Sequence, residues 1–306
     1  MQNLLTVATQ VAVLFALISV GFACRRTKLL NDVSVRGLVD ILILIVTPCL
    51  IVEVFQRPYD PEKLGSLGIA FTISVLAHCL AIALATLFIR HKEEKTRVVL
   101  KTATVFSNAG FMGIPLEQAI LGDEGVFFGI VYVVVFNLFM WSWGLWIMGG
   151  RPSVKQMLVN PGTIGLAAGL PLFFMSLTLP EILDKPIHML AQLNTPVPMI
   201  IIGYYLAGAK FSTVVKNPSA WTAGAIRLIV YPLMMLAILY PFKGRLDRTM
   251  TLAILTAASA PVGAMISMFA AKYRRDVDTS VGIVSATTLA SILTMPLVIS
   301  LAMAVL

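Results

Sequence analysis

Charged residues and cysteines are scarce in this sequence, and their scarcity limits the kinds of protein it can encode. Only 12% of the residues are charged, 58% are hydrophobic, and the mean hydropathy is +0.90, whereas soluble domains carry about 25% charged residues. The three cysteines, Cys24, Cys49 and Cys79, are single and widely spaced, which argues against a disulfide framework or a structural zinc site. A large soluble domain is therefore excluded.

Motifs for ATP-driven pumping and for common hydrolases are also missing. The sequence has no G-x-x-x-x-G-K-[ST], no H-E-x-x-H and no G-x-S-x-G, and its intramembrane carboxylates are not paired as in a protease. An intramembrane enzyme would need a nucleophile and a base, or metal ligands, facing each other at depth. A sensor would bring a soluble output domain, for which the short connectors leave no room. Both stay remote alternatives, so we expect a protein that is not an enzyme and has no cofactor or metal.

The apolar residues come in long runs separated by short connectors. A run of about 20 apolar residues crosses about 30 Å of hydrocarbon, so the sequence predicts an all-α polytopic membrane protein with ten transmembrane helices. The first run is longer than the apolar region of a signal peptide and has no basic residues before it, so we expect a true span. The ten predicted spans are 4–23, 37–55, 66–89, 98–121, 125–148, 158–178, 189–209, 219–241, 249–271 and 278–304.

The basic residues predict the orientation of these spans. With the N-terminus outside, most of the 23 lysine and arginine residues fall in internal loops, as the positive-inside rule requires; the external loop 242–248 is basic as well. The net charge of +8 is thus assigned to membrane topology and not to nucleic acid. We expect a multi-pass protein of the cell membrane (the bacterial inner membrane), surrounded by lipid bilayer, with both termini outside. The internal loops are 24–36, 90–101, 149–157, 210–218 and 272–277.

The spans repeat along the chain. Spans three and eight correspond, as do spans five and ten, and Pro115 in the fourth span has a counterpart in Pro261 of the ninth. The sequence therefore predicts two five-helix repeats, 1–149 and 150–306. Because five is odd, the second repeat is inverted relative to the first, a design that recurs in secondary transporters.

Two spans contain residues that break helices. The fourth carries FSNAGFMGIPL (106–116) and the ninth carries TAASAPVGAM (256–265). In hydrocarbon, backbone groups freed by proline are tolerated only where protein or a wet cavity covers them. Matched breaks in inverted repeats predict a midplane substrate site, and the helix N-termini formed there favour an anion. The alternative is a pair of ordinary proline kinks with small residues for tight packing. The residues expected at the crossing are Ser107, Asn108, Gly110, Gly113, Pro115, Ser259, Pro261 and Gly263.

The same motifs resemble those of the auxin efflux carrier superfamily over the whole chain. The similar stretches are S-N-A-G-F-M-G-I-P-L (107–116), L-I-L-I-V-T-P-C-L-I (42–51) and R-L-I-V-Y-P-L (227–233). The resemblance implies broken helices 4 and 9 that cross at the substrate. It also implies a scaffold of helices 1, 2, 6 and 7 beside a mobile transport bundle of helices 3–5 and 8–10. The bacterial members of this superfamily are called malate and malonate permeases. The resemblance therefore implies a homodimer that moves a small organic anion by an elevator-like motion.

The resemblance also assigns a second wall of the site. Pro48, Asn194 and Pro198 would line it from the scaffold. Relatives often carry Asn and Thr shortly after the proline of the ninth span, where this chain has Met265 and Ile266. Whether side chains of the second break contribute to substrate binding, in addition to its backbone, is therefore left open.

Other polar residues inside the spans are candidates for coupling transport to a proton or another ion. The candidates for proton or ion coupling are His78, Asn137, Thr288 and Ser291, and the coupling ion, H⁺ or Na⁺, is left open. For His78 the alternative is a neutral ring bonded to a neighbouring carbonyl. Arg227, about two turns into the eighth span, is expected to snorkel to lipid headgroups. The first alternative function is a sodium-coupled organic-anion symporter of the related bile-acid type.

Overall fold

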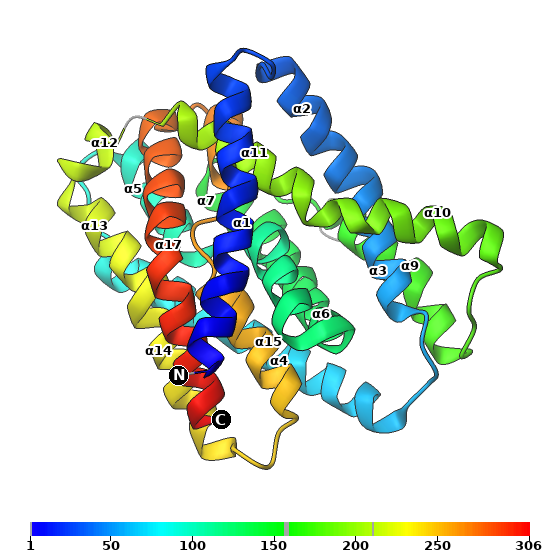
Figure 1. Cartoon of the computed structure of the whole chain (residues 1–306). Coiled ribbons are helices and arrows are strands. Elements are labelled where there is room, and N and C mark those ends of the chain that lie inside the picture. Colours follow the sequence, from blue (N-terminus) through cyan, green and yellow to red (C-terminus); the bar gives the residue numbers. More distant parts are fainter. Residues whose placement is uncertain (1, 156–158, 210) are drawn as a thin grey trace.

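The computed structural model describes residues 2–155, 159–209 and 211–306, and it is built from helices (Figure 1). Among these residues no strand forms, and the one extended pairing is a bridge between Ser107 and Val262. Two features of the sequence analysis lie outside the described residues. They are Lys210, at the start of an internal loop, and the start of the sixth predicted span at 158.

The helices of the first half of the chain are α1 (Gln2–Arg26), α2 (Asp32–Ile41), η1 (Leu42–Val46), α3 (Thr47–Phe55), α4 (Pro61–Phe88), α5 (Glu94–Val105), η2 (Ala109–Gly113), α6 (Ile114–Phe139), η3 (Met140–Gly144) and α7 (Leu145–Ile147). Those of the second half are α9 (Pro161–Phe174), α10 (Glu181–Ala191), η4 (Gln192–Asn194), α11 (Pro196–Ala207), α12 (Ser212–Val215), α13 (Pro218–Ala225), η5 (Ile226–Val230), α14 (Tyr231–Leu239), η6 (Tyr240–Phe242), α15 (Arg248–Ser259), α16 (Met265–Lys272) and α17 (Val277–Val305).

Six helical runs in the described chain are long and apolar enough to cross a membrane. Large apolar side chains such as Leu76 and Leu293 stand on the exterior, where only lipid removes them from water. The chain is thus a multi-pass membrane protein. The count of ten spans stays a prediction, because the segments 98–121, 189–209 and 249–271 are divided between shorter helices. The six runs are Leu5–Arg26, Asp32–Phe55, Pro61–Phe88, Ala109–Ile147, Pro218–Phe242 and Val277–Val305.

The longest of these runs, Ala109–Ile147, changes direction at Gly122. This residue has φ 68° and ψ −161°, inside an otherwise helical stretch. Residues with a side chain rarely adopt a positive φ, so glycine is the residue that permits the turn. The kink falls between 121 and 125, where the sequence predicts the end of the fourth span and the start of the fifth.

Three helices have a π-helical turn just before a proline. The turns are η1 before Pro48, η2 before Pro115 and η5 before Pro232. Proline lacks an N–H, and its ring clashes with the carbonyl one turn earlier, so a wider turn relieves the contact. At η1 the hydroxyl of Thr47 donates to the carbonyl of Leu42 at 2.9 Å, which also accepts the backbone N–H of Thr47.

Glycines bring several helices into backbone contact. A Cβ on Gly203 would lie 1.9 Å from the carbonyl oxygen of Ile18, so α11 and α1 touch at a point that no side chain fits. A Cβ on Gly165 of α9 would lie 2.9 Å from the Cα of Pro48 on α3. Close approach through small residues is the usual way that helices pack in membranes. Pro48 therefore lies in the contact between α3 and α9.

One group of helices packs around α6 and α15. These two helices lie against each other, and α4, α5, α14 and α17 share one hydrophobic core with them. Figure 1 shows α1 beside α17 and both chain ends at the same end of the helices. The core buries the middle of α15 completely.

Candidate functional site at two paired helix breaks

Two non-helical segments pair with each other inside the molecule. Residues 106–108 separate α5 from η2, and residues 260–264 separate α15 from α16. The N–H of Asn108 donates to the carbonyl of Pro261 at 2.6 Å, and the N–H of Gly263 donates to the carbonyl of Phe106 at 3.0 Å. Each break thereby satisfies backbone groups of the other, which could not stay unpaired away from water.

Two further contacts fix the second break. A Cβ on Gly263 would lie 3.0 Å from the carbonyl oxygen of Ser107, so a side chain there would push the two segments apart. The N–H of Val262 donates to the hydroxyl of Thr287 on α17 at 3.2 Å. The two breaks are therefore held to each other and to the last helix.

A cavity of about 780 Å³, here named the apolar cavity, lies beside the paired breaks. Most of its wall is hydrophobic, and two basic residues, Arg36 and Lys272, line it together with one acidic residue, Asp40. Such a wall suits a ligand with an apolar body and a few polar groups. Its lining includes Ile43, Leu44, Phe111, Ile130, Val133, Phe136, Trp141, Met265, Met268 and Phe269.

Two helix N-termini face the apolar cavity. The first helical bonds of η2 run from Met112 and Gly113 to the carbonyl of Asn108, so the N–H groups of the preceding residues are the open donors of a helix start. Gly110, which belongs to that first turn, lines the cavity. Met265, at the start of α16, lines it as well. Both starts carry partial positive charge, so an anionic group is favoured between them.

Asn108 is the candidate side-chain donor at this point, with its Nδ2 buried next to the cavity wall. It lines the apolar cavity, is 5% exposed, and its Nδ2 has no hydrogen-bond partner among the described residues. Asn137 lines the same cavity, but its amide donates to the carbonyl of Val133 at 2.9 Å. Asn194, from η4, also lines the cavity, and its role in a scaffold wall stays a prediction.

The expectation that Arg227 snorkels to lipid headgroups is wrong. Its side chain is fully buried, with Nη1 donating to the carbonyls of Thr104 at 3.3 Å and Val105 at 3.0 Å. Nη2 donates to the carbonyl of Ala258, and the guanidinium carbon lies 4.4 Å from the ring centroid of Tyr231. The open carbonyls at the ends of α5 and α15 carry partial negative charge. One buried cation therefore caps both helices that end at the breaks.

The other residues predicted at the crossing have different surroundings. Gly113 packs on α15, where a Cβ would lie 3.3 Å from the Cα of Ala257. Pro115 lines a second cavity, described below. The hydroxyl of Ser259 donates to the carbonyl of Leu255 in its own helix. Pro198 is buried in α11 and, like Pro48, lines neither cavity in the described structure.

The remaining coupling candidates lie away from both cavities. His78 is buried among aromatic rings, including Tyr132 at 4.9 Å between ring centroids, and its Nδ1 lies 2.8 Å from the carbonyl of Ser74. On α17, the hydroxyl of Ser291 donates to the carbonyl of Thr288 at 2.6 Å. Ile266, which follows Met265 where relatives often carry a polar pair, is buried and lines neither cavity of the described chain.

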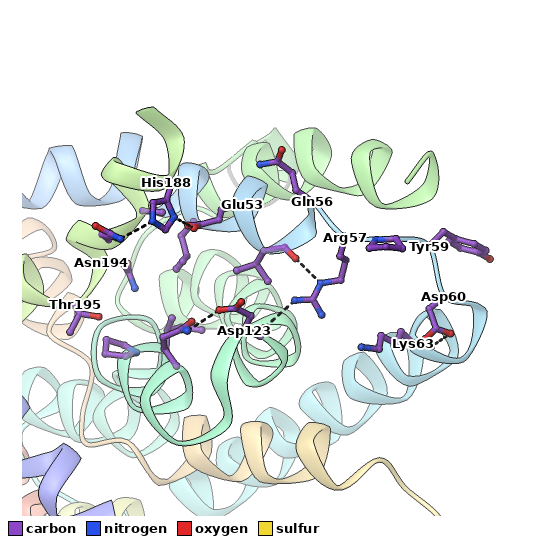
Figure 2. A pocket seen from close by; sticks show the side chains of 18 of the residues that line it. Glu53, Gln56, Arg57, Tyr59, Asp60, Lys63, Asp123, His188, Asn194 and Thr195 are labelled. Atoms are coloured by element: carbon purple, nitrogen blue, oxygen red, sulfur yellow. Dashed lines mark hydrogen bonds and ion pairs between the residues drawn. The ribbon is translucent and has the colours of Figure 1, made fainter. Parts of the chain in front are cut away.

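A second cavity of about 920 Å³, here named the polar cavity, lies between α3, α10 and the start of α6 (Figure 2). Figure 2 shows Arg57 beside Asp123, whose carbonyl accepts from Nη2 at 3.2 Å. The two cavities share three lining residues, Leu50, Ile114 and Asn194. These three side chains therefore form the boundary between them.

Glu53 and His188 form an ion pair on the wall of the polar cavity (Figure 2). The hydrogen bond that Nδ1 of His188 donates to the carboxylate of Glu53, together with the charge of that carboxylate, raises the pKa of His188 above its usual range. A group whose pKa is raised on folding adds stability below its unfolded pKa and loses it as the pH rises through the folded value.

We expect thermal stability to fall slightly as the pH rises through the raised pKa of His188. This fall in stability is small because the ion pair of Glu53 and His188 is partly exposed to solvent. A melting series across this pH range should show it in the wild type and in the control His91→Gln, and a flatter profile in His188→Gln. An unchanged fall in melting temperature with pH in His188→Gln would contradict the attribution of this pH dependence to His188.

Together, the fold and the paired breaks define a class, the multi-pass helical membrane proteins with interrupted helices at a central cavity. The chain belongs to the membrane transport protein family, the auxin efflux carrier superfamily, whose model matches residues 6–157 and 150–299. An uncharacterized transporter of Methanothermobacter thermautotrophicus is 25% identical over 291 residues, which cover 92% of this chain and 93% of the relative. The chain is thus a membrane transporter.

Proposed function

We propose that this chain is a secondary transporter for small organic anions, carboxylates in particular, with the substrate at the crossing of broken helices 4 and 9. The observation that carries this proposal is the meeting of two helix N-termini and the unpartnered amide of Asn108 in one cavity. Donors fixed by the fold replace the water that a carboxylate loses on binding. Gly110 and Gly263 leave the backbone open to close approach.

The wall of the apolar cavity narrows the class of carboxylate. Its hydrophobic side chains would contact the body of the substrate, while Arg36 and Lys272 would attract the anion. A volume of about 780 Å³ also exceeds what a very small dicarboxylate fills. Monocarboxylates with an apolar body are therefore favoured over malate or malonate, the substrates that the resemblance to bacterial permeases suggests.

The arrangement of the two cavities supports alternating access. They lie on either side of Leu50, Ile114 and Asn194, so a shift of the transport bundle (helices 3–5 and 8–10) against the scaffold (helices 1, 2, 6 and 7) would open one and close the other. Two inverted five-helix repeats, 1–149 and 150–306, would provide the symmetry for this elevator-like motion. Both termini lie at the same end of the helices in Figure 1, as expected for an even number of spans.

The surroundings of the transporter are proposed from the family and from the charge pattern. We place it in the cell membrane, as a homodimer in the lipid bilayer, with both termini outside. The basic loops predicted on the inner side support the orientation.

A sodium-coupled symporter of the bile-acid type is the second candidate. It is favoured by buried hydroxyls without a hydrogen-bond partner in the described structure, those of Ser107, Thr256 and Thr288. Such oxygens suit a hard cation. Sodium-dependent binding would separate this candidate from the first.

A thermal-shift screen tests the proposed function directly. Purified protein is melted with benzoate, malonate, malate or cholate, each with and without sodium. A ligand that binds the folded state at 100 times its Kd adds about 2.7 kcal/mol of stability. We expect benzoate to raise the melting temperature more than malonate does, without sodium. Shifts by neutral sugars alone, with none by any carboxylate, would contradict the proposal.

A further inference from the structure

Glu117 is a buried carboxyl that the substrate site does not use. It lies on α6 two residues after Pro115, and its side chain is completely buried. Neither carboxyl oxygen has a hydrogen-bond partner in the described part of the chain. An ionised carboxylate without partners is very costly inside a protein and inside a membrane. In this conformation the group is therefore neutral, with its proton bound.

The surrounding backbone makes room for this carboxyl. A Cβ on Gly129 would lie 1.6 Å from Oε2 of Glu117, so any larger residue at that position would displace the side chain. Oε1 lies 3.5 Å from the place of a Cβ on Gly113, at the contact of η2 with α15. Two glycines thus form a slot of the size of one carboxyl group.

No charged neighbour compensates Glu117. The titratable or charged groups packed against α6 are Glu62, Lys63, His78 and Cys79 on α4, Cys49 and Glu53 on α3, Arg57 after α3, Cys24, Arg25 and Arg26 on α1, Arg248 on α15, and Asp123, Glu124 and Tyr132 on α6 itself. None of these groups bonds to or forms an ion pair with Glu117 in the described structure. Of these groups, His78 is the fully buried one that can gain a charge near neutral pH.

Glu117 itself lines neither cavity, but residues next to it in the chain lie at both of them. Ile114, Pro115 and Gln118, its neighbours on the first turns of α6, line the polar cavity. Gly113, one turn earlier, is the last residue of η2, and other residues of η2 line the apolar cavity. A proton from the polar cavity would have to pass the first turns of α6 to reach this buried carboxyl, while the proposed substrate anion would lie at the start of the same helix.

We propose that Glu117 is the proton-binding site that couples proton movement to carboxylate transport, an inference that rests on the proposed function. Ionised Glu117 would repel a carboxylate held at the start of its own helix, because like charges interact strongly away from water. Protonation removes that repulsion, so the anion binds when the proton is bound, and the two travel together. The step forms one O–H bond on Glu117 with a proton from water in the polar cavity, and the bond breaks when the proton returns to water on the other side.

The test measures carboxylate and proton fluxes in the same liposomes. Purified protein is reconstituted with a pH-sensitive dye inside, and labelled benzoate or malonate is added without sodium. Proton flux and benzoate or malonate counterflow are recorded for the wild type, Glu117→Gln and Glu117→Leu. Glu124→Gln, which alters a partly exposed carboxyl on the same helix that pairs with Lys63, is the matched control, and His78→Gln tests the rival buried group. Melting temperatures show whether each variant is folded; removal of an unpartnered buried carboxyl should not lower them.

We expect Glu117→Gln and Glu117→Leu to lose the proton flux and keep counterflow, while Glu124→Gln and His78→Gln keep both. The inference is overturned if Glu117→Gln keeps the proton flux, if His78→Gln alone loses it, or if the wild type carries the anion with no proton. In those cases the proposed function still stands. A wild type that carries neither carboxylate overturns the proposed function and the inference together.

Discussion

Alanine at position 108 is expected to reduce carboxylate transport to background while the protein stays folded. The substitution removes the unpartnered amide of Asn108 from the apolar cavity and leaves the backbone bond from its N–H to Pro261 in place. A hydrogen bond to a charged group contributes about 1.5–3 kcal/mol, and each 1.4 kcal/mol is about tenfold in affinity. Counterflow of labelled benzoate in liposomes measures the effect.

Asn137→Ala is the matched control for this variant. Asn137 lines the same cavity, but its amide is already bonded to the carbonyl of Val133, so its removal should reduce counterflow much less. Equal losses in the two variants, or wild-type counterflow by Asn108→Ala, would contradict the role given to Asn108.

A double variant, Pro115→Ala with Pro261→Ala, tests the same site through its backbone. Pro115 follows the π-helical turn of η2, and Pro261 lies in the second break. Alanine at both positions allows regular helical bonds to form, which removes the reason for the breaks. We expect a folded protein without counterflow. Normal counterflow by the double variant would show that the breaks are not needed.

Methionine at position 227 is expected to cause the largest loss of stability. Arg227 donates to the carbonyls of Thr104, Val105 and Ala258, and no other group in the described structure caps these carbonyls. Removal of one partner from a buried charged network costs about 3–5 kcal/mol. Melting of the purified protein in detergent should therefore begin at a much lower temperature.

Two further variants separate charge from packing at this position. Arg227→Lys keeps a cation but cannot reach three carbonyls with one planar group, so it should recover part of the stability. Arg151→Met, which alters an exposed arginine, should melt like the wild type. If Arg227→Met melts like the wild type as well, the guanidinium does not hold the ends of α5 and α15.

Local features of the sequence predicted where the helices are interrupted, because glycine and proline act on the backbone next to them. Residues 106–108 and 260–264 are non-helical where the two motifs occur. The hydrogen bonds from Asn108 to Pro261 and from Gly263 to Phe106 could be inferred only from the repeat, since they join segments far apart in the chain. Ser259 illustrates the limit: its hydroxyl is satisfied within its own helix, which no local pattern indicates.

The errors and omissions of the sequence analysis concern buried ionisable groups. Snorkelling is the common outcome for an arginine near the end of a span, but Arg227 lies in the eighth span next to the broken ninth and is buried there. Glu117 follows Pro115 by two residues, and a carboxylate in an apolar run is itself a sign of function.

The most direct test of the central claim is to locate a bound carboxylate. The structure of the purified protein with 4-bromobenzoate, whose bromine marks the ligand by its strong scattering, would show which cavity is occupied. We expect the carboxylate beside Asn108, Gly110 and Gly263, with its ring in the apolar cavity. A ligand bound instead at Arg57 and Lys63 in the polar cavity, with the paired breaks empty, would contradict the account.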